Sequence, residues 1–172
     1  ATTGILFNHE SPLRGKEFVT RKVTDGIARI IANECETLYL GNLNAKRDWG
    51  HAKDYVAGIY KIMQAIEPSD FVLATGRTET VETLVSMACA SAGLNIEWIT
   101  RQDQKVAIAV TSGKPIVVTD PNLYRPSEVD ILVGDFSKAK RELNWHPSIN
   151  LEELVNEMMI ADLERYQVGS KQ

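Results

Sequence analysis

Two arginines in turn-like stretches carry the strongest chemical signal in this sequence. Arg47 lies in the block KRDWGHAKDY (residues 46–55), and Arg125 lies in the block YRPSEVD (residues 124–130). A planar guanidinium presents a fork of N–H donors that matches phosphate oxygens, and binding residues gather on loops. From the residues alone, each arginine is more often a surface or ion-paired side chain. Phosphate binding is therefore one of two interpretations at this point.

The sequence lacks the motifs for independent dinucleotide binding, for several kinds of catalysis and for metal binding. No G-x-G-x-x-G follows a predicted strand, so an independent dinucleotide-binding domain is not expected. None of the five tyrosines is followed by a lysine four positions later, and there is neither a P-loop nor a nucleophile elbow. The three histidines, His9, His51 and His146, lack the spacing of metal ligands. We expect no catalytic residue and no metal site in this chain.

Composition predicts one globular domain over residues 1–172. The chain is 44% hydrophobic and 24% charged, with a formal net charge of −4, a balance that allows a buried core and disfavours broad nucleic-acid binding. No apolar run is long enough to span a bilayer and no leader pattern is seen, so we expect no membrane partner and a cytoplasmic protein. A basic cluster indicates either a solvated helix start or a site for one phosphorylated ligand: Arg14, Lys16, Arg21 and Lys22.

Hydrophobic periodicity predicts alternating helices and strands, hence an α/β fold with a small sheet flanked by helices. The expected helices cover residues 17–32, 51–66, 78–92, 137–143 and 151–165, and Asn150, with Glu153 three positions later, is the predicted cap of the last one. The expected strands cover residues 3–7, 37–40, 71–74, 96–99 and 116–119. Residues 101–115 are expected to form a loop or a mobile hairpin. In the second helix, Asp48 is the predicted cap, and one stripe is predicted to face the core: Ala52, Tyr55, Val56, Ile59, Met63 and Ile66.

Three blocks together resemble the second half of GDP-mannose 4,6-dehydratase, an extended short-chain dehydrogenase/reductase. They are NHESPLRG (residues 8–15) and the two arginine-containing blocks. In that family an N-terminal Rossmann half holds NADP and a C-terminal half holds the nucleotide sugar. The resemblance runs from about residue 3 to residue 166 and is weakest over 101–115. It implies that this chain corresponds to the C-terminal, GDP-mannose-binding half and lacks the Rossmann half.

The resemblance assigns substrate contacts residue by residue. Arg47 and Arg125 match the arginines that clamp the diphosphate, which reverses the odds stated above. The other matched positions are Asn8 at the sugar diphosphate, Glu128 at the ribose hydroxyls, Val19 and Lys22 at the nucleotide, and Leu40 and Gly41 against the guanine. Patterns alone would make Asn8 a turn residue, Glu128 a partner of Arg125, and Val19 and Leu40 core residues.

The resemblance also assigns two cofactor contacts. His9 matches a residue near the nicotinamide side of NADP, and Arg14 matches a polar contact to the same molecule. By itself, His9 would more often be a satisfied loop histidine.

The implied activity is conversion of GDP-D-mannose to GDP-4-keto-6-deoxy-D-mannose, an early step toward GDP-fucose and GDP-rhamnose. The catalytic tyrosine, lysine, glutamate and threonine or serine of the family belong to the missing half, so the chain alone is expected to be inactive. Two alternatives stay open: a stand-alone module that binds a nucleotide sugar or a complete dehydratase subunit, and a sister activity on another sugar nucleotide. An apolar face at Ile5, Leu6 and Phe7 predicts a homo-oligomer or association with a complete subunit.

Overall fold

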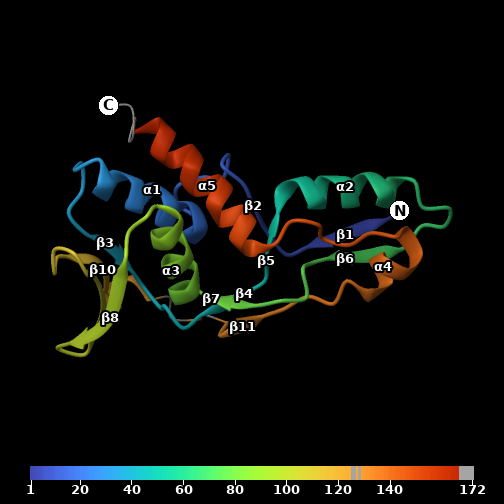
Figure 1. Ribbon diagram of the computed structural model, residues 1–172. Coiled ribbons are helices and arrows are strands. Elements are labelled where there is room, and N and C mark those ends of the chain that lie inside the picture. Colours follow the sequence, from blue (N-terminus) through green and yellow to red (C-terminus); the bar gives the residue numbers. More distant parts are fainter. Residues whose placement is uncertain (125–126, 128, 167–172) are drawn as a thin grey trace.

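A computed structural model describes residues 1–124, 127 and 129–166 (Figure 1). It contains α-helices and short strands in alternation, as the sequence predicts for an α/β protein. The α-helices are α1 (Val19–Ile31), α2 (Ala52–Met63), α3 (Val81–Ser91), α4 (Ser137–Leu143) and α5 (Leu151–Arg165), with a 3-10 turn η1 (Pro121–Leu123). The strands are β1 (Thr3–Leu6), β2 (Asn8–Glu10), β3 (Leu38–Leu40), β4 (Lys46–Arg47), β5 (Trp49–His51), β6 (Asp70–Leu73), β7 (Glu79–Thr80), β8 (Ile96–Arg101), β9 (Gln104–Ala109), β10 (Pro115–Thr119) and β11 (Ile131–Leu132).

The described strands form four small sheets. The largest has the order β3-β10-β9-β8, with β10 parallel to β3 and antiparallel to β9. β1 pairs only with β6, in parallel, and β2 pairs in parallel with β5. The fourth sheet has the order β11-β4-β7. Short pairs of this kind place loop residues from distant parts of the sequence next to one another.

Two buried clusters hold these elements together. The larger cluster joins α1, α3 and α5 to the four-stranded sheet, through residues such as Ile27, Leu84 and Val117. The smaller cluster joins α2 to β6 and α4, where Tyr55 and Trp145 meet edge-on with ring centroids 6.0 Å apart. Figure 1 shows the corresponding arrangement, with α1, α3 and α5 gathered at one end and α2, β1, β6 and α4 at the other.

A buried ionic network fastens α5 to α1. Asp162, fully buried, accepts hydrogen bonds from Arg21 Nη2 at 2.7 Å, Arg21 Nε at 2.9 Å and Thr24 Oγ1 at 2.7 Å. Arg21 Nη1 also donates to the backbone oxygens of Pro12 and Arg14. Because burial leaves water unable to replace these partners, the network fixes the loop before α1 as well as the packing of the two helices.

For residues 101–115 the sequence left two alternatives, a loop or a mobile hairpin, and residues 104–109 belong to a hairpin. They form β9, which pairs with β8 on one side and β10 on the other. The connection after Arg101 is a two-residue turn in which Gln102 and Asp103 have φ values of 48° and 63°. Two positive φ angles match the turn type whose twist suits a hairpin. The sequence did not decide between the two alternatives because this turn contains neither glycine nor asparagine, the residues that usually mark it.

The predicted inward stripe of α2 is wrong at most of its positions. Tyr55 is buried as predicted, but Val56, Ile59 and Met63 are exposed, by 65%, 40% and 68% respectively. The buried face instead includes Tyr55, Gly58 and Ile62. The periodicity was read correctly as helical, but α2 carries apolar residues on two faces, and periodicity alone does not say which one meets the core.

Asp48 does not cap α2, contrary to prediction. His51 is the N-cap, and its Nδ1 accepts the Lys53 backbone N–H at 3.0 Å. The buried Asp48 carboxylate instead accepts the N–H groups of Thr75, Gly76 and Gly134 at 2.8, 2.9 and 3.2 Å. It therefore ties β4 and β5 to the segment that follows β6. The predicted capping of α5 is confirmed, with a reciprocal box between Asn150 and Glu153.

Candidate functional site

A cavity of about 260 Å³ brings together most of the predicted substrate residues. It lies where β2, the start of α1, the end of β3 and the β4–β5 segment meet. Six of the eight predicted positions line it: Asn8, Val19, Lys22, Leu40, Gly41 and Arg47. The other two, Arg125 and Glu128, lie outside the described residues. We call this space the nucleotide cavity.

Gly41 shows why the cavity has its shape. An added Cβ there would lie 2.6 Å from the backbone oxygen of Leu123. Only glycine therefore permits η1 to lie this close to the end of β3. Leu123 lines the cavity beside Leu40 and Gly41, so the segment leading into the Tyr124-Arg125 block reaches the cavity.

The start of α1 supplies backbone donors to the same space. Its N-cap is Phe18, in an extended conformation, and no side chain among the described residues caps the helix. Phe18, Val19 and Lys22 all line the cavity. The first N–H groups of a helix have no partner within the helix, and together with the helix dipole they favour an anion. The cavity therefore has backbone donors without a helical partner at this end, next to Glu17, the one carboxylate among the described residues that line it.

Trp49 adds a buried donor in need of a partner. Its side chain is only 4% exposed, and Nε1 has no hydrogen-bond acceptor among the described residues. A buried N–H without an acceptor is costly, and Trp49 lines the cavity. Neighbouring Arg47 directs Nη1 to the backbone oxygens of Lys46 at 2.8 Å and Val129 at 2.6 Å. These bonds hold the guanidinium against the backbone at Val129.

Sequence reasoning missed several residues of the nucleotide cavity. Trp49 stands in a block that was recognised, but it received no role, and nothing in the sequence marked its N–H as lacking an acceptor. The other missed lining residues are Glu17, Phe18, Asn42, Ala45, Val81 and Leu123. Their approach depends on how β3, η1 and the α1 start meet, which spacing along the chain does not reveal.

The two predicted cofactor residues, His9 and Arg14, come from the same sequence block but make separate contacts. His9 Nδ1 lies 2.8 Å from the backbone oxygen of Phe7, and its ring stacks on Tyr55 with centroids 5.0 Å apart. Arg14 Nε lies 3.1 Å from Glu10 Oε2, and the guanidinium sits 3.5 Å from the centre of the Phe18 ring. Burial raises the pKa of Glu10, although Thr20 and Arg14 oppose that shift.

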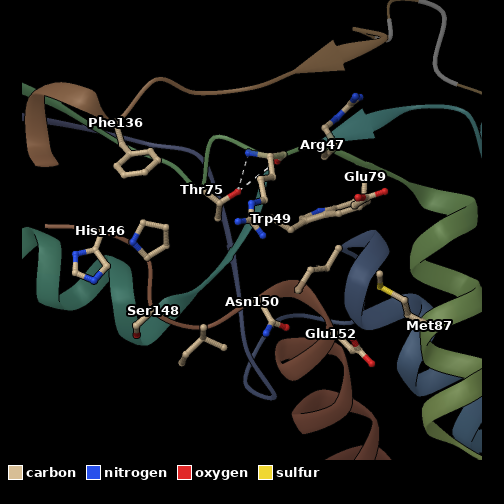
Figure 2. Close-up of a pocket in the computed structure, with 14 residues that line it drawn as sticks. Arg47, Trp49, Thr75, Glu79, Met87, Phe136, His146, Ser148, Asn150 and Glu152 are labelled. Atoms are coloured by element: carbon tan, nitrogen blue, oxygen red, sulfur yellow. Dashed lines mark hydrogen bonds between the residues drawn. The ribbon is translucent and has the colours of Figure 1, made fainter.

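A larger cavity of about 500 Å³ shares Arg47 and Trp49 with the nucleotide cavity. Figure 2 shows it between the Arg47–Glu79 side and the segment that carries His146, Ser148 and Asn150. Of the predicted substrate residues, it contains Arg47 alone. The nucleotide cavity is therefore the better candidate for the predicted site, despite its smaller volume.

The described residues contain no group of three histidine, cysteine, aspartate or glutamate side chains arranged to hold a metal ion. Among the same residues, no helix has the length and apolar character needed to cross a membrane. Cys89 is buried, which raises the pKa of its thiol to about 12, so it is an unreactive core residue.

Comparison with known proteins gives the family. The family model for GDP-mannose 4,6 dehydratase matches residues 1–158. The chain belongs to the GDP-mannose 4,6-dehydratase family. It is 47% identical over 172 residues to the GDP-mannose 4,6-dehydratase of Sinorhizobium fredii, covering 100% of this chain and 49% of that protein. It is 48% identical over 164 residues to the human GDP-mannose 4,6 dehydratase, covering 95% and 44%.

This member of the dehydratase family spans about half the length of the curated relatives it matches. Solved structures show the same fold at low sequence identity. RMD from Pseudomonas aeruginosa, complexed with NADPH, has a TM-score of 0.75 and 17% identity over 94% of this chain and 47% of its own. dTDP-glucose 4,6-dehydratase from Bacillus anthracis, in complex with NAD, has a TM-score of 0.69 and 17% identity over 96% and 45%. The prediction of a small-sheet α/β portion of an extended short-chain dehydrogenase/reductase is therefore confirmed.

Proposed function

We propose that this chain is the GDP-mannose-binding half of a GDP-D-mannose 4,6-dehydratase. The observation that carries the proposal is the convergence of six predicted substrate residues, from four separate stretches of sequence, on one cavity. The family relatives are named for GDP-mannose. The complete reaction converts GDP-mannose to GDP-4-keto-6-deoxymannose, toward the nucleotide sugars of fucose and rhamnose.

The diphosphate is the part of the substrate that the cavity fits best. The Arg47 guanidinium favours negative charge, and the Asn8 amide supplies a further donor. Arg125 and Glu128 complete the set as proposed partners of the diphosphate and the ribose hydroxyls. Leu40 and Val19 give an apolar surface for a flat base. In this assignment the chain binds and orients the substrate, and other groups act on its C4, C5 and C6 atoms.

NADP is the proposed cofactor, and it supplies hydride acceptance and return when bound. His9 fits a role beside it, because donation from Nδ1 to the Phe7 oxygen leaves Nε2 as an acceptor. Arg14 fits a polar contact, because its guanidinium is positioned by Glu10 and Phe18 before any ligand arrives. These two residues would hold one side of the cofactor.

The partner that completes the site is a second polypeptide segment of the parallel α/β type. β1 and β6 form a two-stranded parallel sheet, whereas parallel sheets are ordinarily larger and covered on both faces. Of the three residues predicted to form an apolar face, Ile5 is exposed, whereas Leu6 and Phe7 are partly buried against the smaller cluster because their side chains meet its core. The exposed apolar residues of α2 lie at the same end of the molecule (Figure 1). Apolar faces of this kind drive association, whether with a complementary half, a complete subunit or a second copy.

The catalytic consequence is tested by mixing the chain with GDP-mannose and NADP and following 4-keto product. We expect none from the chain alone. We expect product when a separately expressed N-terminal half of a family member is added. Turnover without any other polypeptide would overturn the proposal that catalysis belongs to the other half.

The binding role is tested by titrating GDP-mannose into the chain by calorimetry. Because half of the enclosing walls are absent, we expect a dissociation constant of roughly 0.1 to 10 mM. Failure of Arg125→Ala to weaken that affinity would remove the diphosphate assignment at that position.

A further inference from the structure

Glu17 is a side chain of the nucleotide cavity to which no role has been assigned. It is the one carboxylate among the described residues that line this cavity. Within the described part of the chain, no hydrogen bond or ion pair engages it, and the same is true of the ammonium group of Lys22. Glu17 is exposed and Lys22 is half-buried, so an anion and a cation line one cavity, each open to a ligand and without a protein partner among the described residues.

Gly15 makes room for the Glu17 carboxylate. A Cβ added at Gly15 would lie 2.5 Å from each of the two carboxylate oxygens. The carboxylate thus folds back over the glycine, just before α1 begins. Lys22 lies in the first turn of the same helix and lines the same cavity. Glu17 and Lys22 are close in sequence, so the start of α1 largely determines where the two charged groups lie relative to each other.

We infer that Glu17 and Lys22 together select guanine as the base of the nucleotide. Guanine carries adjacent N1–H and 2-amino donors next to its O6 acceptor. A carboxylate can accept both donors in a bidentate way, and an ammonium group can donate to O6. Leu40 supplies an apolar surface for the flat ring. Glu17 is the specificity-determining residue in this arrangement.

Other bases do not match this pair of charges. Uracil places a carbonyl oxygen on each side of its single ring N–H, so one carboxylate oxygen of Glu17 would face another acceptor. Adenine would turn its amino group toward the Lys22 ammonium and the lone pair of N1 toward the Glu17 carboxylate. Hypoxanthine keeps the N1–H and O6 of guanine and lacks only the 2-amino group. The predicted order of affinity is GDP, then IDP, then UDP and ADP.

The inference rests on the proposed function, and one experiment separates the two. The 172-residue chain is titrated with GDP, IDP, UDP and ADP, with detection by amide chemical shifts. We expect GDP to bind roughly ten-fold more tightly than UDP, the scale of one good bidentate contact to a base. In Glu17→Gln one acceptor becomes a donor, so the ratio of GDP to IDP affinity should fall toward one.

Glu67→Gln is the matched control. It removes the same charge from an exposed position that does not line the cavity, and it should leave every ratio unchanged. Equal binding of GDP and UDP, or an unchanged GDP to IDP ratio in Glu17→Gln, would overturn the role of Glu17 and leave the proposed function standing. Absence of binding by all four nucleotides would overturn the proposed function, and the role of Glu17 with it.

Discussion

Removal of the Asp162 carboxylate should cost more stability than any exposed charge in this chain. Asp162 is 0% exposed, and the Arg21 side chain that it binds is 6% exposed. The hydrogen bond from Arg21 to Asp162 raises the pKa of the guanidinium above its ordinary value. In Asp162→Ala, Arg21 would keep its charge in a buried site with no carboxylate in hydrogen-bond range. Breaking a buried pair by removing one partner costs about 3–5 kcal/mol.

Urea unfolding followed by far-UV circular dichroism measures this cost. With a slope of about 2 kcal/mol per molar urea, a loss of about 4 kcal/mol moves the midpoint by about 2 M. Glu142→Ala is the control, because the Arg141–Glu142 pair is exposed, and such pairs contribute about 0–1 kcal/mol. The double variant Arg21→Met with Asp162→Leu should recover much of the loss, since it removes both members of the buried pair, while Asp25 keeps Lys16 as its partner and Arg165 is partly exposed to water. A loss below about 1 kcal/mol in Asp162→Ala would refute the reasoning.

Three further perturbations follow from the contacts described above. Gly58→Ala would place a Cβ 2.6 Å from a Leu73 methyl group, so overpacking should lower the unfolding free energy by about 1–3 kcal/mol in urea titrations. The hydrogen bond from His51 lowers the pKa of Glu157 below its ordinary 4.5. The depressed pKa stabilises the folded protein fully above pH 4.5, and this contribution is lost as the pH falls through the pKa of Glu157 in the folded state. Glu157→Gln should therefore flatten the pH dependence of the unfolding free energy below about pH 4.5. Arg47→Ala should weaken GDP-mannose binding by roughly ten-fold or more in calorimetry while leaving mannose binding unchanged, and equal losses for both ligands would argue against a diphosphate contact.

The sequence predicted the positions of the helices better than it predicted which face of each helix is buried. Strong periodicity and the Asn150–Glu153 pair located α5, because local bonds determine where that helix begins. The buried face of α2 was mispredicted because Val56 and Met63 are as apolar as Ile62, and only tertiary packing decides between them. Large exposed apolar residues of this kind suggest a surface that another segment covers.

The recognised sequence blocks predicted which residues belong to the candidate site, but the sequence did not predict how those residues are arranged in space. Asn8, Lys22 and Arg47 were predicted as substrate residues from these blocks, and all three line the nucleotide cavity. Asp48 was wrongly predicted to cap α2, because its actual hydrogen-bond partners lie 27 to 86 positions away in sequence. The unsatisfied Trp49 donor could not have been predicted either, since satisfaction of a buried group depends on every neighbour in space.

The most direct test of the central claim is a titration of GDP-mannose into the isotopically labelled chain, with UDP-glucose as the control sugar nucleotide. We predict saturable amide shifts at Val19, Lys22 and Gly41 with GDP-mannose, and much weaker shifts with UDP-glucose. Shifts centred on Met87 and Ser148 of the larger cavity, or no shifts at millimolar GDP-mannose, would contradict the assignment of the nucleotide cavity as the substrate site.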